Sequence, residues 1–89
     1  MVTAIILINV ERHLVNEIAE QLAGMREISE VFSVSGEYDL IAVVRVADTD
    51  AMAELVTSHL LKIDGIEKTA TLLAFKAYSR HDLEAMFSL

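Results

Sequence analysis

The stretch VFSVSGEYDLIAVVRV, residues 31–46, decides the fold, because it holds two apolar strands with a polar break between them. Residues 28–35 alternate apolar and polar side chains, which predicts a half-buried strand. Residues 39–47 predict the other strand of the pair. The turn at 36–38 joins the two as a β-hairpin in which Gly36 supplies the permissive backbone. Asp39 stands directly before the apolar run 40–44. A carboxylate in that place either caps the hairpin or binds a ligand.

Regular patterns flank the hairpin on both sides. Residues 2–10 are rich in β-branched side chains and predict a first strand that is buried on both faces. A helix is predicted to follow, stopping near Gly24, because apolar side chains recur at helical spacing: Leu14, Val15, Ile18, Leu22 and Met25.

The second half of the chain repeats this order. The acidic stretch 48–50 is typical of a helix N-terminus, and Asp64-Gly65 predicts its end. The apolar face of this helix consists of Leu55, Val56, Leu60 and Ile63. Residues 66–79 predict a fourth strand, and the tail 80–89 predicts a short amphipathic helix.

The resulting β-α-β-β-α-β order predicts one α+β domain over residues 1–89, a ferredoxin-like antiparallel sheet with a C-terminal helix. Its helices should cover one face, but both faces are apolar at their centres. Ile6 and Ile8 oppose Ile5 and Leu7 in the first strand. We therefore expect two copies to pack sheet against sheet as a dimeric α/β-barrel.

Composition supports self-association and excludes several classes of protein. Of 89 residues 54% are hydrophobic, and the mean hydropathy of +0.46 is high for a small monomer. The net charge of −7 and the scattered Lys and Arg exclude an electrostatic footprint for nucleic acid. No apolar run reaches the roughly 18 residues of a membrane span. Because the N-terminus lacks signal-peptide features, the expected localisation is cytoplasmic.

The sequence lacks the signatures of common catalytic sites, so we expect a protein that is not an enzyme and needs no cofactor or metal. It has no cysteine, no G-x-S-x-G, no G-x-G-x-x-G and no Walker loop, and its three histidines lack metal-ligand spacing. Two other classes stay open. A small dimeric α/β-barrel monooxygenase would need a cavity between sheet and helices or bind haem. An ACT-like amino-acid-binding module would pair side by side.

Two motifs at matching positions carry a resemblance to a known family. The segment 31–46, a helix, and then LLKIDGIEKTATLLAFKAYS over residues 60–79 resemble the effector-binding (RAM) domain of Lrp/AsnC regulators. The pattern is G-x-x-D after a strand, then L-x-x-I-x-G-I-x-x-T-x-T entering the last strand, and it covers Thr3 to Tyr78. Full-length regulators carry an N-terminal helix-turn-helix domain, whereas this chain begins in its first strand. A stand-alone effector domain is therefore expected.

The resemblance implies partners and a ligand site. Dimers would join into octamers or similar rings, and a small effector, typically an amino acid, would bind between dimers. Regulation would be indirect, through co-assembly with full-length Lrp/AsnC regulators. The positions that this resemblance marks for the ligand are Gly36, Glu37, Tyr38, Asp39, His59, Thr69 and Thr71.

Each of these residues also has a purely structural interpretation. The turn alone requires Gly36, and Asp39 is a residue that often accepts backbone N–H bonds within a hairpin. Glu37 and Tyr38 fit an exposed turn. The two threonines suit any strand edge, and His59 suits a half-buried helix position.

Overall fold

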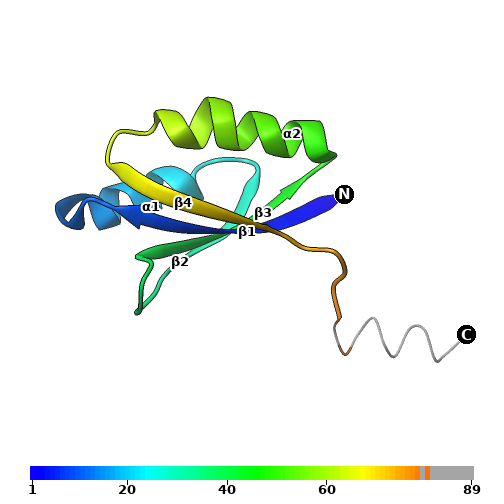
Figure 1. Ribbon diagram of the computed structural model, residues 1–89, viewed down its shortest axis with the longest axis horizontal. Helices are drawn as coiled ribbons and strands as arrows, with labels where there is room; N and C mark the ends of the chain where they lie inside the picture. The colour runs from blue at the N-terminus through cyan, green and yellow to red at the C-terminus, as the bar shows by residue number, and fades with distance from the viewer. Residues whose placement is uncertain (79, 81–89) are drawn as a thin grey trace, which may run out of the picture.

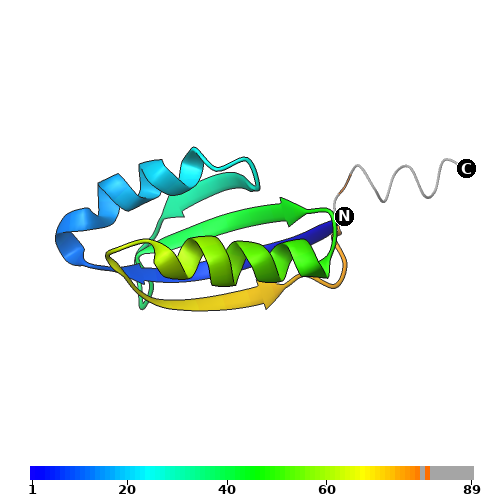
Figure 2. The same ribbon diagram turned by 90° about the horizontal axis from the view of Figure 1, so that it is seen from above.

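A four-stranded antiparallel sheet with both helices on one side forms the domain (Figures 1 and 2). The computed structural model describes residues 1–78 and 80. The strands are β1 (Val2–Val10), β2 (Ile28–Ser33), β3 (Leu40–Val46) and β4 (Ile66–Leu73), in the order β2-β3-β1-β4. This order confirms the predicted α+β ferredoxin-like fold. Within the described residues, no helix has the length and apolar character needed to cross a membrane.

The first helix forms as its apolar spacing predicts. A short 3₁₀ turn, η1 (Arg12–Leu14), leads into α1 (Val15–Ala23). Ile18 and Leu22, one turn apart, are the buried residues of α1 and pack into the core. The amide of Gly24 donates to the carbonyl oxygens of Glu20 and Leu22, and so ends the helix where the sequence predicts.

The second helix begins as predicted but is not regular throughout. Asp48 is its N-cap, and its Oδ1 accepts a 2.8 Å bond from the amide of Ala51. After α2 (Thr49–Glu54) comes a π-helical turn, η2 (Leu55–His59), and then a 3₁₀ turn, η3 (Leu60–Lys62). The amide of Leu60 reaches back five residues to the carbonyl of Leu55. This wider turn buries both leucines on the core side, which an even α-helical spacing does not do.

The strand register separates two apolar faces. Ile6 lies beside Ala42 and Thr71 on the helix side, where Ile6 and Ala42 are fully buried. Ile5 lies beside Val43 and Leu72 on the opposite side. We call that side the helix-free face, and its apolar residues are Ile5, Leu7, Phe32, Ile41, Val43, Ala70 and Leu72. The expectation that β1 is buried on both faces is wrong for a single chain, since Ile5 is 38% exposed.

The fourth strand is shorter than predicted. It ends at Leu73, and the last bond to β1 runs from the amide of Ala74 to the carbonyl of Thr3. Because β1 begins at Val2, which the register places opposite Phe75, β1 offers no residue to pair with residues 76–78. The described part of this segment descends on the helix-free side of the sheet (Figure 1). Apart from Arg80, the tail helix expected over residues 80–89 lies outside the described residues.

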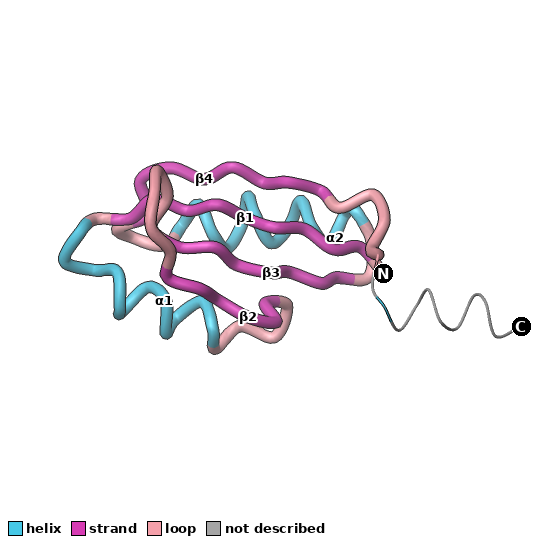
Figure 3. Tube along the Cα trace, turned by 90° about the horizontal axis from the view of Figure 1, so that it is seen from below, coloured by secondary structure: helices cyan, strands magenta, loops and turns pink. Residues whose placement is uncertain are grey.

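The polar break in the hairpin is a loop of residues 34–39, longer than the expected tight turn. Both strands of the hairpin are correspondingly shorter than predicted. Figure 3 views the helix-free face and shows the loop crossing one end of the sheet, from β2 towards β4. Gly36, at φ +109°, gives the loop a backbone conformation that other residues rarely adopt.

Gly65 and Gly36 allow a matched test of packing against backbone strain, because both have a positive φ. A Cβ on Gly65 would lie 2.6 Å from Leu14 Cδ1 and 2.9 Å from Ile18 Cδ1, whereas a Cβ on Gly36 meets nothing within 4 Å. Gly65→Ala should lower the free energy of unfolding by about 2–4 kcal/mol, and Gly36→Ala by only about 1–2 kcal/mol, in urea denaturation. If both variants lost the same free energy of unfolding, the side chains of Leu14 and Ile18 would not pack against Gly65 in this way.

Candidate functional site

Asp39 fastens the 34–39 loop to the end of β1. Its Oδ2 accepts a 2.9 Å hydrogen bond from the amide of Val10. Its own amide donates to the carbonyl of Ile8 at 3.0 Å, and its carbonyl accepts from the amide of Val34 at 3.0 Å. The carboxylate therefore serves a backbone N–H at the end of β1, and not one within the hairpin as its structural interpretation expected.

An open cleft of about 850 Å³ lies beside this junction. Three segments that are distant in sequence form it: the end of β1 with the residues that follow, the 34–39 loop, and the start of β4. The lining residues are Asn9, Val10, Glu11, Arg12, His13, Glu37, Asp39, Glu67 and Lys68. Carboxylates and cationic side chains thus line the same cleft, an arrangement that suits a ligand carrying both charges.

Two contacts position charged side chains at the cleft. The ammonium of Lys68 lies 5.8 Å from the centre of the Tyr38 ring, within the range of a cation–π interaction. Nε2 of His13 lies 3.7 Å from Oε2 of Glu11, with both side chains largely exposed. Tyr38 therefore links the loop to β4, across the end of the sheet.

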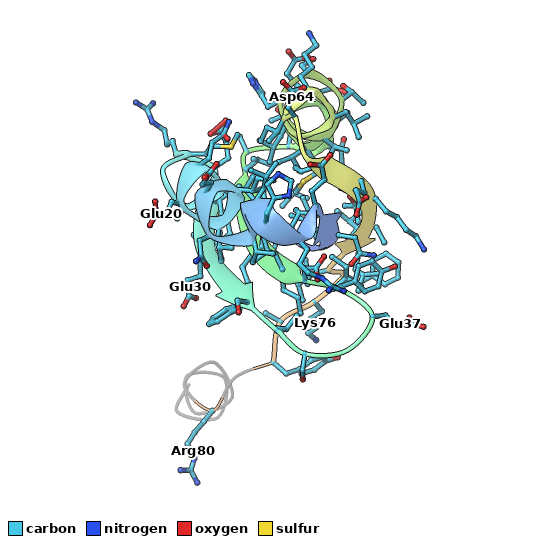
Figure 4. The ribbon with its side chains drawn as sticks, turned by 90° about the vertical axis from the view of Figure 1, so that its left-hand side faces the viewer. Glu20, Glu30, Glu37, Asp64, Lys76 and Arg80 are labelled. Atoms are coloured by element: carbon cyan, nitrogen blue, oxygen red, sulfur yellow. The ribbon has the colours of Figure 1, made fainter. Side chains whose placement is uncertain are left out.

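Four of the residues that the sequence marked for a ligand lie together in the loop. Glu37 and Asp39 line the cleft, and Glu37 points outward from the body of the protein (Figure 4). Gly36 directly precedes Glu37 in the chain, and Tyr38 lies between Glu37 and Asp39. Open space surrounds a Cβ built on Gly36, so within one chain only its φ calls for glycine.

The other three marked residues lie elsewhere in this chain. Thr69 pairs with Ile8 and Thr71 with Ile6, which places both threonines on the helix side of the sheet. His59 is exposed at the end of the π-helical turn, in the helix layer. None of the three lines the cleft that Glu37 and Asp39 share.

Several cleft residues were not predicted from the sequence, although the strand topology offers a signal for them. In the β2-β3-β1-β4 order, the end of β1 lies next to the start of β4. Polar side chains after one strand and at the start of the other therefore meet. From this strand order, the following residues are expected at the cleft: Glu11, Arg12, His13, Glu67 and Lys68.

The space between sheet and helices is filled with apolar side chains. Within the described residues every buried side chain is hydrophobic, and the largest fully buried ones include Ile6, Leu22 and Leu40. Residues 1–78 and 80 also contain no group of three or more His, Cys, Asp or Glu placed to hold a metal ion. The polar groups of this domain gather at the end of the sheet instead, around the cleft.

Comparison with known proteins identifies the family. The model of the Lrp/AsnC ligand binding domain matches residues 3–83. An HTH-type transcriptional regulator of Pyrococcus furiosus is 35% identical over 74 residues, which is 83% of this chain and 49% of the relative. A Bacillus subtilis regulator of the same type is 33% identical over 67 residues, 75% of this chain and 40% of the relative. The chain thus spans half or less of the length of these curated relatives.

Solved structures agree with this result. The protein TTHA0845 of Thermus thermophilus is 42% identical with a TM-score of 0.84, and the match covers 90% of this chain and all of that one. The Escherichia coli AsnC structure superposes with a TM-score of 0.82 at 22% identity, over 88% of this chain and 53% of that one, and shows the shared fold. The structure is thus an α+β domain of ferredoxin-like fold. The chain belongs to the Lrp/AsnC ligand binding domain family.

Two substitutions at Asp39 separate the loss of its hydrogen-bond acceptor from the loss of its negative charge. Asp39→Ala leaves the amide of Val10 without its acceptor and should lower the free energy of unfolding by about 1–3 kcal/mol. Asp39→Asn keeps an acceptor oxygen and should lose less than about 1 kcal/mol. Hydrogen exchange at the Val10 amide should accelerate in Asp39→Ala. An unchanged exchange rate would refute the role given to this carboxylate.

Proposed function

We propose that this chain is a regulatory domain that binds an amino acid or similar small metabolite in the cleft beside the 34–39 loop. The observation that carries the proposal is the mixture of acidic and basic side chains around that loop, in a member of a ligand-binding family. The cleft is open in one chain, so a second dimer docked against it would enclose the ligand. The resemblance to Lrp/AsnC regulators, which places effectors between dimers, agrees with this arrangement.

The cleft offers both kinds of group that a zwitterion requires. Glu37 can receive an ammonium group, as can the Asp39 oxygen that does not accept the Val10 amide. Arg12 or Lys68 can bind the carboxylate, together with backbone amides of the loop. His59, Thr69 and Thr71 lie outside this cleft, so each would contact a ligand there only from a neighbouring subunit.

The same proposal includes a homodimer formed through the helix-free face. The seven apolar residues of that face form one continuous surface across the four strands, and Ile5 and Leu72 are substantially exposed in one chain. Burial of apolar area stabilises association by about 25 cal/mol per Å² before the costs of association are subtracted. A second copy supplies an identical apolar surface, and further joining of dimers would build an octamer or similar ring.

Two leucines of similar exposure test the dimer. Leu72 is 52% exposed on the helix-free face, and Leu61 is 60% exposed in the helix layer. Leu72→Glu should weaken dimerisation by about 100-fold or more, because the new charge would be buried in the interface. Leu61→Glu should leave the association constant within about twofold of the wild type. Sedimentation equilibrium measures both, and equal behaviour of the two variants would contradict the proposed interface.

We further propose that regulation is indirect, through mixed assemblies with helix-turn-helix relatives. Relatives named HTH-type regulators are 35% and 33% identical to this chain over the shared domain, which supports compatible assembly surfaces. A ligand that contacts two dimers would favour one assembly state over another through linkage. Native mass spectrometry of the wild type mixed with a purified full-length relative should show mixed oligomers. Leu72→Glu is the matched control that should not form them.

Amino-acid binding is testable by thermal shift with light scattering. One or a few of the proteinogenic amino acids should raise the midpoint and change the assembly mass, since a ligand at tenfold its Kd adds about 1.4 kcal/mol. L-Met belongs in the screen because a related Neisseria meningitidis regulator has been solved as an L-Met complex. Glu37→Gln should weaken binding by about tenfold or more, through loss of a charge-assisted bond.

Glu20→Gln is the control for this change, because Glu20 is exposed on α1, away from the cleft (Figure 4). The two variants lose the same charge, so a difference between them reports on the cleft. Absence of any shift at about 10 mM ligand, where even millimolar binding is detected, would overturn the amino-acid proposal.

A further inference from the structure

A second, smaller pocket of about 260 Å³ lies at the other end of the sheet from the cleft. It is formed by the start of β1, the end of β3 and the segment that follows β4. Its lining residues are Met1, Thr3, Arg45, Ala74, Phe75, Lys76 and Ala77. Thr3 and Arg45 are neighbours in the β1–β3 register, on the helix-free side. Lys76 lies on that same side, below the sheet in Figure 4.

The charge of this pocket is opposite to that of the protein. The chain carries 14 acidic and 7 basic residues, yet two of the basic residues line this pocket and none of its lining residues is acidic. The cleft at the other end, by contrast, includes four carboxylates among its lining residues. An anion is therefore attracted to this end of the helix-free face and not to the protein as a whole.

The guanidinium of Arg45 is held in place from one side. Its Nη1 donates a 3.0 Å hydrogen bond to Oγ of Ser29 on β2, which leaves its other N–H groups for a ligand. The ammonium of Lys76 lies 5.1 Å from the centre of the Tyr78 ring. A planar fork of donors and a second cation that lines the same pocket match the oxygen atoms of a carboxylate or phosphate.

We propose that this pocket binds an anionic oxygen group, with Arg45 as the main donor, Lys76 as the second cation and Ser29 as a positioning residue. Its volume is below the roughly 300–1,000 Å³ of sites for larger organic ligands, so a small oxyanion or a single carboxylate fits. Two sources supply that chemistry, a free anion or a carboxylate side chain of a second copy. The first source is independent of the proposed function, and the second rests on the proposed dimer.

Calorimetric titration of the full chain with phosphate, sulfate and acetate, at constant ionic strength, tests the free anion. Binding should be measurable at millimolar concentrations, and Arg45→Gln should weaken it by about tenfold or more. Ser29→Ala should weaken it about two- to fivefold with no change in charge. Lys62→Gln is the control for the loss of one positive charge, because Lys62 is exposed at the end of η3, and it should bind as the wild type does.

The salt dependence of dimerisation tests the second source. A carboxylate of the second copy in this pocket makes the dimer Kd rise with salt, and Arg45→Gln should flatten that dependence while Arg45→Lys preserves it. Lys62→Gln should keep the wild-type slope. The proposal is overturned if no anion binds and Arg45→Gln keeps the wild-type salt dependence. That result would not bear on the proposed amino-acid site in the cleft, because Glu37→Gln and the amino-acid screen test that site separately.

Discussion

The structure depends on the burial of β1, a central strand whose two faces are both apolar. On one side Ile6 and Ile8 are covered by the helices and are completely buried. On the other side Ile5 and Leu7 lie among the apolar residues of β3 and β4, and neither α1 nor α2 covers them (Figure 3). Covering both sides of a strand with this composition removes more apolar area from water and so stabilises it. The ferredoxin-like fold covers one side, and in our account a second copy covers the other.

The end of β1 also fixes the candidate ligand site. The strand's final amide, that of Val10, donates to Asp39, and the carbonyl of Ile8 accepts the Asp39 amide. The 34–39 loop is thereby attached to the strand that contributes Ile5 and Leu7 to the helix-free face. A ligand held by this loop lies against the framework of the proposed dimer, which gives a physical route from ligand binding to assembly. The anion pocket lies at the opposite end of the same face, where β1 begins.

The sequence predicted the features that depend on local pattern and missed those that depend on neighbours. The bounds of β1, the start of the second helix within residues 48–50 and the α1 core positions follow from side-chain periodicity and cap chemistry, and all were predicted. The end of β4 was missed because it depends on where β1 begins. The π-helical turn at Leu55 was missed because an extra residue in a turn leaves the apolar composition unchanged. Arg12 and Lys68 were missed because strand order, and not spacing, brings them together.

An isotope-filtered nuclear Overhauser experiment on a mixture of ¹³C-methyl-labelled and unlabelled chains detects the proposed sheet-to-sheet dimer directly. Our account predicts contacts between chains from the methyl groups of Ile5, Ile41 and Leu72 on the helix-free face. It predicts none from those of Ile6, which are buried beneath the helices of their own chain. The proposed dimer is contradicted if these methyl groups give no contacts between chains, or if the chain stays monomeric at millimolar concentration.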